Sequence, residues 1–430
     1  RDLHWHDLVG SVRCVLETGS VLVRRTGLSI RGQWCDYQIV VRVVSLSRPL
    51  FALGFRPFYL LASVFAVVAI LLWLANIVGR VHFGDYLQGM FWHSHEMLFG
   101  YIVAVITGFL FTAVRNWTGL PTPTGVMLGG IAVLWLLARV MLVSGPSIPA
   151  IFLDVVFLPI VAIAIAIPIL RSRNKRNYKV VGVLAAVSLL HLLFHLALGG
   201  QLPAWLARAS LFASIDLVVV LFALVGGRVI PAFTRNAVAG SNPHHEPWLE
   251  VVAFGSLLLI ALVTLVGDAL TLAAWLPASL FVVAAVAHLL RLALWQPQLT
   301  LGNPLLWMMP VAYAWLPATL ILRALSTEAL VMPGAWIHAL TMGALTSLMM
   351  AMMMRSTLGH TGRKLVASHM DIAAFLVLQI AALIRVVAGS AGNYQTLVTL
   401  SGLFWVLAFA LFLVRYLPML VQPRVDGKPG

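Results

Sequence analysis

Long apolar stretches separated by short polar connections fill the sequence after about residue 50. Each stretch is long enough to cross a bilayer, since a membrane-spanning helix needs about 20 largely apolar residues. The stretches are expected at residues 51–78, 90–114, 125–143, 148–170, 178–198, 208–232, 247–267, 270–294, 304–325, 331–354, 368–388 and 395–416. The pattern therefore predicts an all-α polytopic membrane protein with about twelve transmembrane helices.

The composition supports the same fold class. Of the 430 residues, 61% are hydrophobic and only 10% are charged, against roughly 25% charged residues in an ordinary soluble domain. The net charge of +14 does not indicate a nucleic-acid partner, because most basic residues stand in short loops that set membrane orientation. Both cysteines, Cys14 and Cys35, precede the first apolar stretch, so a metal site in the membrane must use His, Met or carboxylate ligands.

Three regions follow from this pattern. Residues 1–47 show no clear period and no signal peptide, and we expect a poorly ordered cytoplasmic extension there. Residues 48–418 form the transmembrane domain, and residues 419–430 form a tail. Lys and Arg are concentrated on one side of the predicted membrane, while the opposite loops hold only Arg80, Arg208, Arg323 and Arg385. This asymmetry predicts that both termini are cytoplasmic.

Several ionisable residues lie inside the predicted helices, mostly in the outer half of the membrane. Such groups are costly in lipid and usually functional. His191 and His195 are spaced i, i+4 and share one helix face, so a single metal ion can bridge them. The alternative is two neutral histidines that hydrogen-bond to backbone or hydroxyl groups. Asp154 and Asp216 are expected to support such ligands or to transfer protons.

The second predicted helix begins with His93, His95 and Glu96. On an ideal helix the two histidines point about 200° apart, so we do not expect them to serve one site. Glu96 is expected to lie near His93 and to orient it through a hydrogen bond. Neutral imidazole binds haem iron, copper and zinc alike, so the ligand type alone does not select the metal.

Helices 2, 6 and 10 show a weak common pattern. His95 and Gly100 in helix 2 correspond to His338 and Gly343 in helix 10, and these helices are four apart in the chain. A threefold arrangement of four-helix units would explain this spacing.

Basic and hydroxyl residues stand beside glycines at the predicted cytoplasmic ends of helices 6 and 10. This combination is typical of an anion-binding nest, although it could equally anchor helix ends at lipid headgroups. The residues concerned are Arg228, Arg235, Arg355, His360, Thr361 and Arg363.

Four short motifs together resemble the NnrS family. They are GFRPF at 54–58, WHSHEMLFG at 92–100, NWTG at 116–119 and GHTGR at 359–363, and the resemblance covers about residues 50–418. It implies a twelve-helix protein of the bacterial inner membrane that binds haem and copper and acts in the response to nitric oxide and nitrosative stress.

With this resemblance, we expect haem b to be bound by His93, His95 and His338, and His191 and His195 to bind copper or to supply a second axial ligand. Haem-copper oxidases likewise carry haem ligands on helices 2 and 10, although this is an analogy of fold only. The expected partners are the lipid bilayer, nitric oxide or nitrosylated species, and an electron donor such as quinol or a membrane redox protein. The alternatives are a secondary transporter of a metal, haem or anion, and a sensor or assembly factor without turnover.

Overall fold

The structure is a computed structural model that describes residues 21–26, 36–41, 49–83, 86–144, 147–267, 269–270 and 272–428. The chain divides into two units, residues 1–48 and 49–430. In the first unit, strands β1 (Val21–Thr26) and β2 (Asp36–Val41) pair antiparallel, with Val21 opposite Val41. The expectation of poor order for the remainder of residues 1–47 lies outside the described residues.

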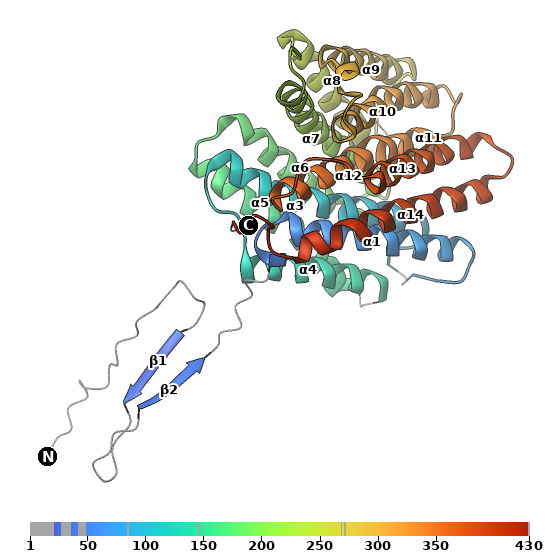
Figure 1. Ribbon diagram of the computed structural model, residues 1–430. Helices are drawn as coiled ribbons and strands as arrows, with labels where there is room; N and C mark the ends of the chain where they lie inside the picture. Colours follow the sequence, from blue (N-terminus) through green and yellow to red (C-terminus); the bar gives the residue numbers. More distant parts are fainter. Residues whose placement is uncertain are drawn as a thin grey trace. The chain divides into compact units, whose positions relative to one another are not determined.

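The described part of the second unit is helical, and twelve of its segments are long and apolar enough to cross a membrane (Figure 1). This confirms the predicted fold class. Ten of the spans contain one long helix each: α1 (Phe55–Ile77), α4 (Gly125–Ser144), α5 (Ser147–Arg171), α6 (Tyr178–Leu198), α7 (Trp205–Ala237), α8 (Pro247–Val266), α9 (Trp275–Leu294), α10 (Pro304–Thr327), α13 (His369–Val387) and α14 (Tyr394–Val421).

Spans 2 and 10 are each composed of three helical pieces. Span 2 runs through α2 (Gly89–His95), a π-helical segment (Glu96–Ile102) and α3 (Val103–Thr118). Span 10 runs through α11 (Pro333–His338), a π-helical segment (Ala339–Thr346) and α12 (Ser347–His360). In both spans the π-helical segment begins directly after a histidine. Such segments are rare and occur mostly at functional sites.

Spans 2, 6 and 10 form the centre of the bundle. Their most apolar windows are 83%, 83% and 78% buried, whereas no other span exceeds 61%. The neighbour pattern repeats every four spans, because α5 packs on α6, α9 on α10 and α14 on α1, while each central span also packs on the span before it. The predicted threefold arrangement of four-helix units requires this pattern. Spans 1 and 12 thus close the bundle, as α1 and α14 show (Figure 1).

Two glycines allow neighbouring helices to approach the π-helical segments closely. A Cβ atom at Gly100 would lie 2.6 Å from the ring of Phe65 in α1, and one at Gly343 would lie 2.4 Å from the ring of Trp315 in α10. Both distances are too short for any side chain larger than hydrogen. In both spans, an aromatic ring from the preceding span thus packs directly on a glycine of the π-helical segment. This close contact holds spans 2 and 10 against their neighbours.

Candidate metal centre

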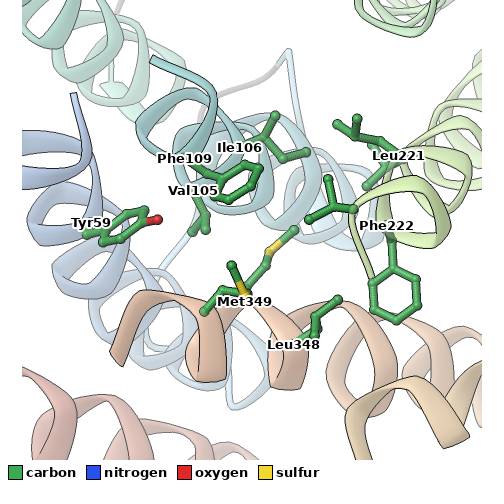
Figure 2. A pocket seen from close by; sticks show the side chains of 11 residues that line it. Tyr59, Val105, Ile106, Phe109, Leu221, Phe222, Leu348 and Met349 are labelled. Atoms are coloured by element: carbon green, nitrogen blue, oxygen red, sulfur yellow. The ribbon is translucent and has the colours of Figure 1, made fainter. Parts of the chain in front are cut away.

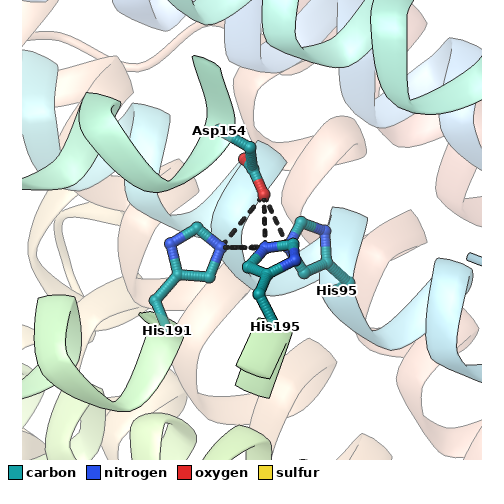
Figure 3. Close-up of side chains that lie close together, drawn as sticks. All are labelled: His95, Asp154, His191 and His195. Atoms are coloured by element: carbon teal, nitrogen blue, oxygen red, sulfur yellow. Dashed lines mark hydrogen bonds and ion pairs between the residues drawn. The ribbon is translucent and has the colours of Figure 1, made fainter. Parts of the chain in front are cut away.

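Four buried side chains from three different spans meet at one point. His95 ends α2, Asp154 lies in α5, and His191 and His195 lie one turn apart in α6; each is at most 3% exposed. Figure 3 shows the three imidazoles turned toward the Asp154 carboxylate. Asp154 Oδ2 is 2.9 Å from the Nε2 atoms of His95 and His195 and 3.0 Å from that of His191.

The imidazole nitrogens also approach one another. His191 Nε2 lies 3.0 Å from His95 Nε2 and 3.1 Å from His195 Nε2. A tetrahedral ion with bonds of about 2.0–2.1 Å would separate its ligand atoms by about 3.3 Å. Five of the six distances between the four donor atoms are 2.9–3.1 Å, near the spacing of a four-coordinate metal site, and together the donors could hold one ion.

The contacts of His95 Nδ1, the ring nitrogen that points away from the cluster, show where this imidazole carries a proton. His95 Nδ1 lies 2.9 Å from Glu96 Oε1, and a carboxylate only accepts hydrogen bonds, so Nδ1 donates. With its proton on Nδ1, the neutral imidazole would offer the lone pair of Nε2 to an ion at the centre, whereas a protonated Nε2 would donate to Asp154 Oδ2, 2.9 Å away. Carboxylate-bound histidines of this kind are the usual arrangement of metal ligands, because the outer partner fixes the tautomer and the ring orientation.

Arg139, in α4, connects the two carboxylates of the site. Its guanidinium donates to Glu96 Oε1 over 2.7 Å and also to Asp154 Oδ1. Asp154 thereby uses one oxygen for Arg139 and keeps the other for the histidines. With neutral histidines, two carboxylates and one guanidinium leave one uncompensated negative charge in a buried site, which is unfavourable. A metal cation would compensate this charge, and in its absence a proton on one imidazole must do so.

Tyr86 closes the site from the connection before α2. Its hydroxyl lies 2.8 Å from His195 Nδ1, and the two rings are stacked nearly parallel. Burial raises the pKa of Tyr86, and the Asp154 charge raises it further, so the phenol stays protonated at neutral pH. When an ion takes the lone pair of His195 Nε2, Nδ1–H can donate to this neutral hydroxyl oxygen.

The expectation that Glu96 orients His93 is wrong. Glu96 bonds to its direct neighbour His95 and to Arg139. The physical reason is electrostatic, because the buried Arg139 attracts the carboxylate to the side of the helix on which His95 lies. His93 instead stacks on Trp73 of α1, with ring centroids 4.7 Å apart.

His93 faces a different cavity, as the angular spacing of residues 93 and 95 predicts. We call it the outer cavity; its volume is about 330 Å³, and His93 of span 2 and His338 of span 10 both line it. Arg385 is its one charged lining residue among those described. His338 Nδ1 donates to the Gly334 carbonyl over 2.8 Å, which leaves Nε2 unprotonated. His93 Nδ1 is buried without a hydrogen-bond partner in the described part of the chain.

Asp216 lies outside both sites. Its carboxylate forms a buried ion pair with Arg323, at 2.6 Å, and accepts a hydrogen bond from Thr264.

Of the six residues in the expected anion site, Arg228, Arg355 and His360 line one cavity at the opposite end of spans 6 and 10. The other three residues, Arg235, Thr361 and Arg363, do not line that cavity. Arg235 donates a hydrogen bond to the Pro243 carbonyl, and the Thr361 hydroxyl donates one to the Thr357 carbonyl at the end of α12.

Arg139 and Tyr86 are the site residues that sequence reasoning missed. Arg139 stands within an apolar run, and an arginine inside a spanning segment is itself a sign of function. That signal was available in the sequence. Tyr86 gave none, since a tyrosine in a short loop is unremarkable until the fold brings it against His195.

The fold and the buried cluster define a class: multi-pass membrane proteins with a buried histidine–carboxylate site, formed between neighbouring spans, that is able to hold a metal ion. Residues 49–424 match the family model described as NnrS protein. This range is nearly the whole chain, and the protein therefore belongs to the NnrS family. A comparison with curated proteins found no match. Family membership supports a role for this membrane protein in the response to nitric oxide.

Proposed function

We propose that this protein acts in the response to nitric oxide and nitrosative stress through two metal groups held in separate places. Copper is held by His95, His191, His195 and Asp154, and haem b is held by His93 and His338. The observation that carries the proposal is the convergence of three imidazole nitrogens and one carboxylate oxygen, all buried, on a single point.

Copper fits the donors of the cluster. Imidazole nitrogen binds copper, zinc and iron well, and copper binds most tightly among the common divalent ions. The buried negative charge that Glu96, Asp154 and Arg139 leave uncompensated favours a cation in the same place. Glu96 and Tyr86 would keep His95 and His195 in the orientation that the ion needs.

Haem b fits the outer cavity. Two histidines from the two spans with π-helical segments line it, and each has a ring nitrogen that no described residue contacts through a hydrogen bond. The cavity volume of about 330 Å³ is within the range of about 300–1,000 Å³ for ligand sites. His93 and His338 would be the iron ligands, and Arg385 would pair with a carboxylate of the haem. A haem iron supplies a centre that binds nitric oxide.

This proposal differs from the sequence-based expectation in the role of His95. His95 was expected among the haem ligands, but its Nε2 lies 3.0 Å from His191 Nε2, and it is absent from the outer cavity. We therefore assign it to copper. Asp154 likewise changes from a supporting group to a ligand, because Oδ2 faces all three histidines.

We further propose the inner membrane of a bacterium as the location, with both termini in the cytoplasm and the two metal groups in the outer half of the bilayer. The basis is the distribution of Lys and Arg along the sequence. Nitric oxide is small and weakly polar, so it can reach these groups through the lipid. Electrons would come from quinol or a membrane redox protein.

The test is a comparison of purified single variants expressed in cells supplied with haem and copper. His338→Ala and His93→Ala should lose haem absorption and keep copper, whereas His191→Ala and His95→Ala should lose copper and keep haem. Nitric oxide added to the reduced wild-type protein should change the haem spectrum. If His338→Ala lost copper and kept haem, or if His191→Ala lost haem and kept copper, the two metal groups would be assigned to the wrong residues.

A further inference from the structure

A third cavity, the inner cavity, lies at the end of the bundle that we predict to face the cytoplasm. It has a volume of about 460 Å³ and is walled by α1, α3, α7 and α12. Among its lining residues, all of them described, none is acidic, and three carry or can carry positive charge: Arg228, Arg355 and His360. A partly enclosed space with several cations and no carboxylate attracts an anion.

The cations are not neutralised by the protein. Arg355 packs over the ring of Phe233, with the guanidinium carbon 4.1 Å from the ring centroid, and it forms no hydrogen bond or ion pair with any described residue. Arg228 donates to Asn177 Oδ1 over 2.5 Å and lies over Trp117, which holds it at the cavity without cancelling its charge. The positive charge of both residues therefore remains available to a ligand.

The glycine-rich end of α12 does not supply the anion site that its sequence suggests. The backbone N–H groups of Thr361, Gly362 and Arg363 are bonded to the carbonyls of Thr357, Gly359 and Leu358. No amide in this stretch is therefore free to form a nest. Side chains, and not backbone groups, must provide the contacts in the inner cavity.

The inner cavity borders a small apolar pocket, of about 60 Å³, in the middle of the bundle. Tyr59, Phe109, Val225 and Met352 line both spaces. Figure 2 shows Val105, Ile106, Leu221, Phe222, Leu348 and Met349 around the apolar pocket, and the hydroxyl of Tyr59 is the one oxygen among the side chains drawn. A ligand bound at the cationic end would therefore have an almost wholly apolar space next to it, with the Tyr59 hydroxyl as the one polar group in its lining.

We propose that the inner cavity binds an anionic amphiphile, with its carboxylate or phosphate group between Arg228 and Arg355 and its hydrocarbon chain directed into the apolar pocket. Guanidinium groups bind both kinds of headgroup by charge-assisted hydrogen bonds. The source of the ligand is either a free fatty acid or an anionic phospholipid, which share this chemistry. The site is independent of the metal groups proposed above.

The experiment is a titration of the full-length protein, in an uncharged detergent, with straight-chain carboxylates of four to ten carbons, with inorganic phosphate, and with mixed micelles containing phosphatidic acid or phosphatidylcholine. We expect affinity to rise with chain length, by up to about fourfold for each buried methylene group, and to level off once the apolar pocket of about 60 Å³ is filled. Phosphate alone should bind weakly. Preferential binding of phosphatidic acid over the carboxylates would identify a lipid as the source, and the reverse would identify a free acid.

Arg355→Gln should weaken binding of every headgroup at least about tenfold. Arg235→Gln is the matched control, because Arg235 lies at the same end of α7 but does not line the cavity. Leu221→Phe should remove the dependence on chain length and leave phosphate binding unchanged. The proposal is overturned if methyl esters bind as tightly as the carboxylates, if affinity does not depend on chain length, or if Arg355→Gln and Arg235→Gln have equal effects.

Discussion

Asp154→Asn tests the cluster most sharply, because it removes one charge and almost no volume. The carboxylate oxygen Oδ2 lies 2.9–3.0 Å from all three Nε2 atoms, so it must be closer than 4 Å to any ion that they share. The asparagine keeps a carbonyl oxygen of similar size at this position, but it carries no charge. We expect the variant to fold and to lose metal affinity.

The magnitude follows from the distances. Two unit charges 4 Å apart attract by about 4 kcal/mol at an effective dielectric constant of about 20, and about 1.4 kcal/mol is a factor of ten in affinity. The amide oxygen retains part of this attraction through its dipole. We therefore expect copper affinity to fall at least about 100-fold. Competition with a copper chelator of known affinity, on purified protein in detergent, measures this change.

The chain offers a matched control in Asp216→Asn. Asp216 is also a buried aspartate paired with an arginine, Arg323, but it lies outside the cluster. Removing one partner of a buried ion pair costs about 3–5 kcal/mol of stability, so this variant should have a lower thermal midpoint with its copper affinity unchanged. Equal copper affinity in the two variants would refute the role of Asp154 as a ligand.

Two further predictions concern the surroundings of the centre. Tyr86→Phe removes the hydroxyl that lies 2.8 Å from His195 Nδ1, and it should lower copper affinity about 10–100-fold; an unchanged affinity in chelator competition would show that the contact does not orient the ligand. Gly343→Ala places a Cβ atom 2.4 Å from Trp315 and should destabilise the bundle by about 1–3 kcal/mol. Gly130→Ala, which meets nothing within 4 Å and lies inside α4, should leave the thermal midpoint unchanged or raise it slightly, because alanine favours a helix more than glycine does. Equal midpoints for the two glycine variants would contradict the close packing at span 10.

The helices could be predicted from the sequence because each is a continuous apolar run of spanning length. The predicted segment 125–143, for example, agrees with α4 (Gly125–Ser144). The π-helical segments could not be predicted, because they depend on how spans 2 and 10 pack and not on their hydrophobicity. The end of span 2 was also placed too early, since Asn116 and Trp117 continue α3 in spite of their polarity.

The candidate site was predictable only in part. Residues within one helix obey simple angular rules, so the shared face of His191 and His195 and the opposite directions of His93 and His95 follow from the sequence. Contacts between helices do not follow from it. His95 meets His191, and Glu96 turns from His93 to Arg139, because four consecutive spans pack side chains against one another that the rules for a single helix cannot place.

The measurement that tests the central claim most directly is the absorption spectrum of the purified protein, oxidised and reduced, together with elemental analysis for iron and copper. We expect a haem b spectrum and one copper per chain, with the copper lost in His191→Ala while the haem spectrum is unchanged. A colourless, metal-free protein obtained from cells replete in haem and copper would contradict this claim.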